Sequence, residues 1–408
     1  MSNKPAKKAA KLAAPLDRGE HVGRMEPLLL SEGSRHRPAL SDLAIELAAR
    51  ATGFRRSLPL GVFAALAELV RSMNCYYSNL IEGHDTHPID IERALRNDYS
   101  QDATKRNLQL EAKAHIEVQH WIDSGALTGR EATATAACEI HRRFCELLPD
   151  ELLWVENPET GDKVRVESGR LRERDVKVGR HAPVSPGAVP RFMQRFEDAF
   201  GGLGKAEAIL ASASMHHRLL WIHPFIDGNG RVARLVSHGL FLRLLDTGGV
   251  WSIARGLARS ATRYKELLSN CDLPRRNDLD GRGNLSEESL AEFTAYFLQT
   301  CLDQVAFMET LVQPDQLRAR VLVWADEEAK LGRLPQRAGR LLEAVLYRGE
   351  LPRADAAAVL DVPERTARRV TSELVQRGVF VSDSTRAPLR LAFPAALAAR
   401  WMPGLFPE

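Results

Sequence analysis

The residues with the clearest chemical potential lie in one short stretch, His223 to Arg234, with the sequence HPFIDGNGRVAR. Gly228 and Gly230 flank Asn229, and glycines in such places let backbone N–H groups approach an anion closely. The same amides open a segment of helical periodicity, and the positive end of a helix dipole favours phosphate. The stretch therefore predicts a phosphate-binding cradle.

Polar side chains of this stretch supply further parts that phosphoryl-type transfer needs. Asp227 offers carboxylate oxygens, which suit Mg²⁺. Arg231 and Arg234 lie three residues apart on one helix face, so both can reach negative charge. His223 can act as a general base near neutral pH. A cradle, a metal ligand, two cations and a base together favour transfer chemistry. The alternative is a surface loop that merely separates two helices.

Every fixed position of this stretch matches the pattern H-P-F-x-[D/E]-G-N-G-R-x-x-R, and here the chain resembles Fic (filamentation induced by cAMP) proteins. The resemblance implies a protein adenylyltransferase, which moves AMP from ATP to a Tyr, Ser or Thr hydroxyl of a target protein or of the chain itself. It implies that His223 removes the hydroxyl proton and that Asp227 holds Mg²⁺ on the α- and β-phosphates. The implied nucleotide contacts continue through Gly228, Asn229, Gly230, Arg231, Val232, Ala233 and Arg234, the last on the γ-phosphate.

Two other segments resemble parts of that family that contact the nucleotide. The family's flap, which lies over the nucleotide and aligns the target backbone, corresponds here to Val178, Gly179, Arg180 and His181. Tyr264 resembles an aromatic position at the nucleoside end. An ordinary place on an amphipathic helix explains Tyr264 nearly as well.

A third segment matches the family's inhibitory pattern [S/T]-x-x-x-E-[G/N] through Ser78, Glu82 and Gly83. A pair of opposite charges about 4 Å apart attracts by about 4 kcal/mol at intermediate dielectric, before desolvation is deducted. If Glu82 pairs with Arg234, the γ-phosphate loses its partner and ATP binds unproductively. The resemblance thus implies the N-terminally auto-inhibited class. In some relatives the same glutamate positions a water that removes AMP, so deAMPylation stays open, and the alternative is that Glu82 is only a solvated last-turn residue.

Apolar periodicity predicts that helices position these groups. The predicted helices cover residues 41–53, 62–80, 103–122, 130–147, 189–200, 206–222 and 231–245, and another begins at 286. Residues 163–166 and 175–179 alternate polar with β-branched side chains around Gly169, which predicts a short hairpin. The fold class is therefore all-α with a small β-hairpin flap.

The sequence pattern changes near Leu334, where shorter predicted elements begin. Helices are predicted at 337–347, 353–360 and 364–376, and the apolar segments 379–381 and 389–391 follow as the strands of a wing, so the outline is a winged helix-turn-helix. Six arginines lie between residues 365 and 390, which suits contact with DNA phosphates. The alternative roles are protein docking and dimerisation, and a homodimer is left open.

These signals predict five parts. They are a disordered basic tail (1–38), an N-terminal helical region with the inhibitory helix (39–125), a catalytic core (126–312), a linker helix (313–333) and the winged helix-turn-helix (334–408). The competing hypothesis is a DNA-binding regulator whose Fic-like domain senses nucleotide. An intact His223 beside Asp227 favours the enzyme, because a sensor needs no base.

Composition adds few constraints. The chain has 408 residues and a net charge of +3, which is too small to indicate a partner for the whole molecule. Its five scattered cysteines include no C-x-x-C pair, so they predict neither a zinc site nor a disulfide framework and fit a reducing cytoplasm. The sequence has no apolar run long enough for a membrane span. It does not identify the target protein, and a nucleotide other than ATP is left open.

Overall fold

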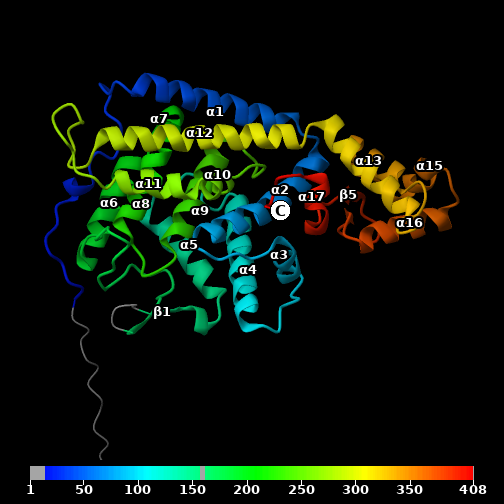
Figure 1. Ribbon diagram of the computed structural model, residues 1–408, viewed down its shortest axis with the longest axis horizontal. Coiled ribbons are helices and arrows are strands. Elements are labelled where there is room, and N and C mark those ends of the chain that lie inside the picture. The colour runs from blue at the N-terminus through cyan, green and yellow to red at the C-terminus, as the bar shows by residue number, and fades with distance from the viewer. Residues whose placement is uncertain (1–13, 157–160, 408) are drawn as a thin grey trace, which may run out of the picture.

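Two long helices, α1 (Arg37–Ser57) and α12 (Glu287–Leu311), lie side by side along one edge of the molecule (Figure 1). The structure is a computed structural model that describes residues 14–156 and 161–407. Ser286 caps α12 by accepting a hydrogen bond from the Ser289 amide, and Glu287 and Glu288 complement the positive end of the helix. Helix α1 continues past Gly53, where the sequence predicted its end, because Phe54 extends its buried face.

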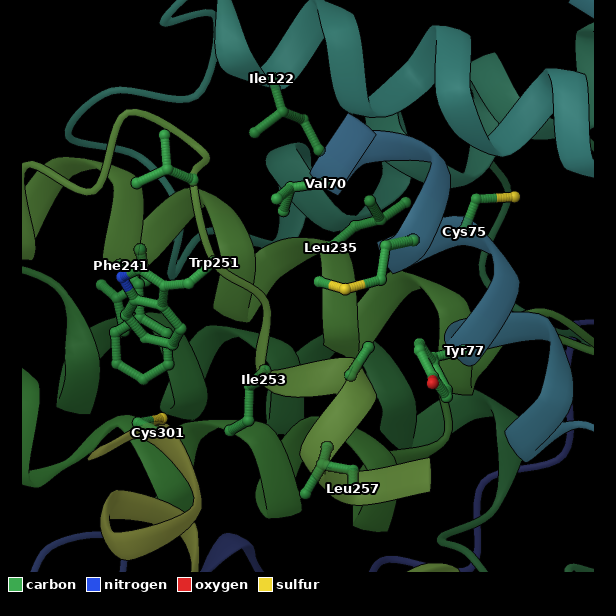
Figure 2. Close-up of a cluster of buried hydrophobic side chains, with 14 of the residues drawn as sticks. Val70, Cys75, Tyr77, Ile122, Leu235, Phe241, Trp251, Ile253, Leu257 and Cys301 are labelled. Atoms are coloured by element: carbon green, nitrogen blue, oxygen red, sulfur yellow. The ribbon is translucent and has the colours of Figure 1, made fainter. Parts of the chain in front are cut away.

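The helical part of the chain that comprises the predicted N-terminal helical region and the predicted catalytic core is built around buried helices. Its main helices are α2 (Leu60–Ile81), α4 (Ala103–Asp123), α5 (Ala134–Glu146), α8 (Ser212–Ile222), α9 (Asn229–Leu245) and α10 (Ile253–Arg259). Helix α9 is buried on nearly all sides, as expected of a helix that is apolar around its circumference. Figure 2 shows Val70 of α2 beside Leu235 of α9, and both belong to one continuous core.

Shorter elements complete this part. They are η1 (Val22–Met25), α3 (Pro88–Leu95), η2 (Asp150–Leu152), η3 (Pro186–Ala188), α6 (Val189–Phe200), α7 (Lys205–Leu210) and α11 (Ala261–Asn270). The predicted helix 206–222 is interrupted at Ala211, which separates α7 from α8. No helix in the described ranges is both long and apolar enough to cross a membrane.

The predicted hairpin forms with a different partner strand. Strand β2 (Lys163–Arg165) pairs antiparallel with β1 (Trp154–Glu156), in the register Val155↔Val164, rather than with residues 175–179. The segment around Gly169 forms a turn, with the Arg170 amide donating to the Glu167 carbonyl at 3.2 Å, but this turn packs on α5, where the Gly169 amide donates to His141 Nδ1 at 3.0 Å. Residues 175–179 contribute only an isolated bridge, Val178 to His181.

The expectation of a disordered tail over residues 1–38 is wrong for the part that the structure describes. Met25 and Leu28 are buried in the core, and the Leu285 amide donates to the Glu26 carbonyl at 2.8 Å. This segment supplies apolar side chains that pack on the predicted catalytic core, so burial offsets the entropy of ordering it. Residues 1–13 lie outside the described residues.

The C-terminal part combines helices with a small sheet. Its elements are α13 (Pro314–Lys330), α14 (Ala338–Arg348), β3 (Glu350–Leu351), η4 (Arg353–Asp355), α15 (Ala356–Leu360), α16 (Glu364–Gln376), β4 (Phe380–Val381), β5 (Leu389–Leu391), η5 (Ala395–Leu397) and α17 (Ala398–Trp401). The sheet is antiparallel with the order β3-β5-β4. The helices and the β4–β5 pair lie close to their predicted positions, and β3 was not predicted. The assignment as a winged helix-turn-helix stays a prediction.

Candidate active site

The predicted reactive stretch forms a tight loop between the end of α8 and the start of α9. His223 ends α8 in the left-handed region with φ 52°, and Gly228 precedes α9 with φ 79°. The Asn229 side chain closes the loop, because its Oδ1 accepts from the Phe225 amide at 3.0 Å and its Nδ2 donates to the Phe225 carbonyl at 2.9 Å. The amides at the start of α9 are thus held in place without any ligand.

His223 is held as a neutral imidazole. Its backbone carbonyl accepts a hydrogen bond from Arg172 Nε at 2.8 Å. Burial, and then the charge of Arg172, lower the pKa of His223 from 6.5 to about 4. At neutral pH the ring is therefore free of its second proton and can accept one, as a general base must.

A cavity of about 510 Å³ opens at this loop, a volume typical of small-molecule sites. Residues that were predicted to meet the nucleotide and that line it are His223, Asp227, Gly228, Asn229, Gly230 and Arg231, together with the predicted inhibitor Glu82. The opposite wall comes from α5, η2 and β1, including Phe144 and Trp154. A base, a carboxylate and helix-opening amides therefore face one space.

Arg231 lies deep in this cavity with incomplete hydrogen bonding. Its Nη2 donates to Asp227 Oδ2 at 3.1 Å, its Nη1 lies 3.5 Å from Glu111 Oε2, and its guanidinium covers the Phe144 ring. Among the described residues, Nε and Nη1 of Arg231 have no hydrogen-bond partner. Buried donors normally find partners, so this position suits phosphate oxygens.

Arg234 is occupied by the predicted inhibitory residues. Its Nη2 pairs with Glu82 Oε1 and its Nε donates to Ser78 Oγ at 2.8 Å. Burial pushes the pKa of Glu82 upward, but the charge and hydrogen bond of Arg234 outweigh it and hold that pKa below its usual range. A Cβ built on Gly230 would lie 2.3 Å from Glu82 Oε1, so the carboxylate rests directly on the cradle. Gly83 follows Glu82 with φ 89° and turns the chain away from α2.

Other predicted nucleotide contacts lie elsewhere. Val232 and Ala233 are buried in α9 and do not line the cavity. Tyr264 is buried on α11, and its hydroxyl is 2.8 Å from His216 Nε2. The structure therefore places Tyr264 in the core, as its amphipathic-helix interpretation expects, and does not bring it to the cavity.

The predicted flap forms a tight turn beside the end of α8. Val178 and His181 exchange two backbone hydrogen bonds of 3.0 Å around Gly179, which has φ 59°. His181 Nε2 is 2.8 Å from the Trp221 carbonyl, which ties the turn to α8 two residues before His223. Val178, Gly179 and Arg180 are exposed, and none of these four residues lines the cavity.

Three residues at the site were missed by the sequence analysis. His141 stacks on Phe225 with ring centroids 4.0 Å apart, and burial lowers its pKa to about 4. Glu111 Oε2 lies 2.7 Å from His84 Nδ1 as well as close to Arg231, and this hydrogen bond raises the pKa of His84. Arg172 binds the His223 carbonyl. None of the three belongs to a local motif, because each acts across a long sequence separation.

The cavity offers limited protein ligation for a metal. No cluster of three or more His, Cys, Asp or Glu side chains with metal-binding geometry occurs among the described residues. Asp227 contributes a half-exposed carboxylate at the cradle. Mg²⁺ commonly uses one or two carboxylates together with substrate phosphates, so this donor fits Mg²⁺ brought in with a nucleotide.

The part of the chain that resembles known proteins includes the reactive stretch. Residues 131–240 match the model of the Fic/DOC family, a range that lies inside the predicted catalytic core. The chain is 33% identical over 125 residues to a protein adenylyltransferase Fic of Drosophila willistoni, covering 30% of this chain and 22% of the relative. It is 28% identical over 170 residues to that of Drosophila grimshawi, covering 41% and 32%. The chain thus spans between about a fifth and a third of the length of these relatives.

A solved structure extends the similarity to the whole fold. A Fic family protein from Desulfovibrio desulfuricans G20 superposes with a TM-score of 0.52 and 14% sequence identity. The superposition covers 89% of this chain and 98% of the other.

Proposed function

Residues 131–240 form a Fic/DOC family domain, and from this premise we propose that the chain is a protein adenylyltransferase inhibited by its own Glu82. Its substrates are ATP, with Mg²⁺, and a Tyr, Ser or Thr hydroxyl of a protein. The observation that carries the proposal is the convergence of neutral His223, Asp227 and the amides of Gly228 to Gly230 on one cavity.

The reaction follows from these positions. His223 accepts the proton of the target hydroxyl, whose oxygen attacks the α-phosphorus of ATP while the bond to the bridging oxygen breaks and pyrophosphate leaves. The helix-opening amides at Gly228 to Gly230 stabilise the negative charge that develops on the α-phosphate oxygens. Asp227 would hold Mg²⁺, which would neutralise negative charge on the phosphates.

Inhibition follows from competition for one guanidinium. Arg234 is buried, with its side chain 3% exposed, and Glu82 and Ser78 take its donors. A γ-phosphate cannot bind Arg234 while Glu82 does, and the Glu82 carboxylate also rests on Gly230. ATP then binds with its α-phosphate misaligned for attack.

The test measures label transfer from α-³²P-ATP with Mg²⁺ in cell lysate. We expect Glu82→Gly to exceed the unmodified chain by at least about ten-fold, the factor that corresponds to about 1.4 kcal/mol of lost ion pairing. Glu82→Gln, which keeps the shape but not the charge, should lie between them, and Glu82→Gly/His223→Ala should transfer nothing. Nucleotide binding without transfer in Glu82→Gly would favour the nucleotide-sensing regulator. Removal of AMP by the chain only when Glu82 is intact would assign deAMPylation.

We also propose that the C-terminal part is a winged helix-turn-helix that contacts DNA. Arg365 and Arg369 of α16 and Arg386 between β4 and β5 are exposed, and the structure gives none of them an ion-pair partner within its described ranges. Arg368 of the same helix pairs with Glu364 at 3.0 Å. Free cations on one helix and an adjacent loop suit phosphate contacts.

Duplex binding at several salt concentrations tests this second proposal. Arg365→Ala/Arg369→Ala should weaken binding and reduce the slope of log affinity against log salt by about two, one for each phosphate contact. Arg368→Ala is the matched control, and we expect a smaller change because its charge is already paired. Salt-independent binding, or none, would favour a protein-docking role.

A further inference from the structure

Arg172 is a buried guanidinium that joins the reactive loop to the segment before it. The residue is 3% exposed and lies in the sequence between β2 and the predicted flap. Its side-chain acceptors are four backbone carbonyls, those of His223 (2.8 Å from Nε), Arg174 (3.0 Å from Nη1), Ile222 (3.5 Å from Nη2) and Val184 (from Nη2). Its own amide donates to the Pro224 carbonyl at 2.8 Å. One residue therefore binds three consecutive carbonyls, 222 to 224.

The charge of Arg172 is compensated by these dipoles and, without direct contact, by the Asp175 and Glu20 carboxylates. All the side-chain hydrogen bonds that the structure records for it go to carbonyl oxygens. Burial lowers the pKa of Arg172 to about 10, so the group stays charged at neutral pH. Burying a charge is unfavourable, and buried groups with strongly shifted pKa values occur more often at functional sites than elsewhere. Packing alone would be served by an apolar side chain of similar length.

The carbonyls that Arg172 binds fix the backbone of the general base. His223 adopts the left-handed conformation, which is unfavourable for residues other than glycine. The last carbonyls of a helix such as α8 lack partners within the helix, and Arg172 satisfies those of Ile222 and His223. The direction from which the imidazole enters the cavity thus depends on this guanidinium.

The same guanidinium fixes the predicted flap. The other two carbonyls, of Arg174 and Val184, bracket the segment 175–183 that contains the Val178 to His181 turn. The Arg172 guanidinium therefore binds both ends of that segment and also the carbonyl of His223.

We infer that Arg172 is a positioning residue that sets His223 and the segment 175–183 in one fixed relation, so that a target hydroxyl aligned by the segment meets the base. The inference rests on the proposed function. The phosphate cradle is fixed separately, by the Asn229 hydrogen bonds to Phe225. Loss of Arg172 should therefore impair the transfer rate and leave nucleotide affinity intact.

Arg218 provides a matched control. It is fully buried on α8, the helix that His223 ends, and it also donates to backbone carbonyls, to Pro27 at 2.8 Å and to Cys271 at 3.4 Å. Burial lowers its pKa to about 10 as well. Arg218 resembles Arg172 in burial, in charge and in donating to carbonyls, and its Nη1 also lies 2.6 Å from His217 Nδ1. None of its acceptors belongs to the reactive loop or the segment 175–183.

The experiment uses the full chain with Glu82→Gly as parent and measures thermal unfolding, ATP affinity by calorimetry, and kcat of label transfer. Arg172→Met should lower kcat by about 100-fold, the loss typical of a misplaced catalytic group, with the Kd for ATP within about three-fold. Arg172→Lys should recover part of kcat, because an ammonium reaches the His223 carbonyl but not all four acceptors. Arg218→Met should lower the unfolding temperature and keep kcat within about three-fold.

Four outcomes are decisive. Equal loss of kcat in Arg172→Met and Arg218→Met, or an unchanged kcat in Arg172→Met, overturns the inference. If Arg172→Met does not fold, Arg172→Lys decides, and parental kcat in that variant overturns the inference too. A parent that binds ATP but transfers no label instead contradicts the proposed function.

Discussion

At the scale of single residues, the surroundings of His223 favour the form of the ring that its proposed role as a base needs. Its ring is kept neutral by burial and by the neighbouring Arg172, which together lower its pKa to about 4. A lowered pKa means that the base form persists as pH falls and is lost only near the new pKa. The rate of a reaction that needs the base form should likewise stay nearly constant as pH falls and decrease only near that pKa.

We therefore expect transfer by Glu82→Gly to change by less than about two-fold between pH 8 and pH 6. A histidine with an ordinary pKa of about 6.5 would be only about one quarter neutral at pH 6 and would lose about four-fold. The measurement is kcat against pH, with ATP affinity recorded at each point. His84→Gln in the same parent is the control, because His84 lines the same cavity and hydrogen bonding to Glu111 raises its pKa. A four-fold loss that persists in the control contradicts the expectation.

At the scale of elements, α5 acts as the support of the reactive loop. Its His141 stacks on Phe225 from one side and accepts the Gly169 amide through Nδ1. The segment after β2 must approach α5 closely for this bond, since a Cβ on Gly169 would lie 2.7 Å from Arg142 Cβ and 3.1 Å from the Cys138 carbonyl. Gly169 also has φ 69°. The contact thus requires glycine at position 169 for two reasons, the lack of room for a Cβ and the positive φ.

Gly169→Ala should lower the free energy of unfolding by about 2 kcal/mol or more, through backbone strain and the clash with α5, and should reduce transfer in the Glu82→Gly parent. Gly202→Ala is the matched control. Gly202 has φ 79° but open space around it, so its replacement should cost only about 1 kcal/mol and leave transfer intact. Denaturant unfolding and label transfer measure the two effects. Similar losses in both variants would show that the contact with α5 contributes nothing.

At the scale of the whole molecule, the C-terminal end lies against the helix that carries the inhibitory residues. The C-terminus lies beside α2 and α17 (Figure 1). The Tyr77 hydroxyl donates to the Leu405 carbonyl at 2.9 Å, and the ring of Tyr76 meets that of Phe406 edge-on at 5.7 Å. Tyr77 immediately precedes Ser78, so the last residues of the chain support the helix end from which Glu82 reaches Arg234.

Leu405→Ala, with Glu82 intact, should raise basal transfer as well as lower stability, because it loosens the support of this helix end. Leu351→Ala is the control, since Leu351 is equally buried but lies in the small C-terminal sheet. Each replacement should cost about 2–5 kcal/mol of unfolding free energy. Label transfer measured below both unfolding temperatures separates them. Equal transfer by the two variants would show that the C-terminal end does not act on the inhibitory helix.

The sequence by itself determined the reactive loop, because its chemistry depends on local spacing. The order of base, carboxylate, glycines and arginines fixes a turn and a helix start whatever the rest of the chain does. The expected pair of Glu82 with Arg234 is present, since its motif encodes both partners. Helices with strong periodicity, such as α6 and α16, begin and end where the pattern predicts.

Only the tertiary structure decided which distant residues support that loop. Arg172, His141 and Glu111 carry no local signal, because carbonyls, rings and charges brought together by packing define their roles. The same reason accounts for Tyr264, which faces His216 in the core rather than the cavity. The pairing of β2 with β1 and the burial of Met25 have the same origin. Both are stabilised by contacts with residues that are distant in the sequence, so local patterns do not predict them.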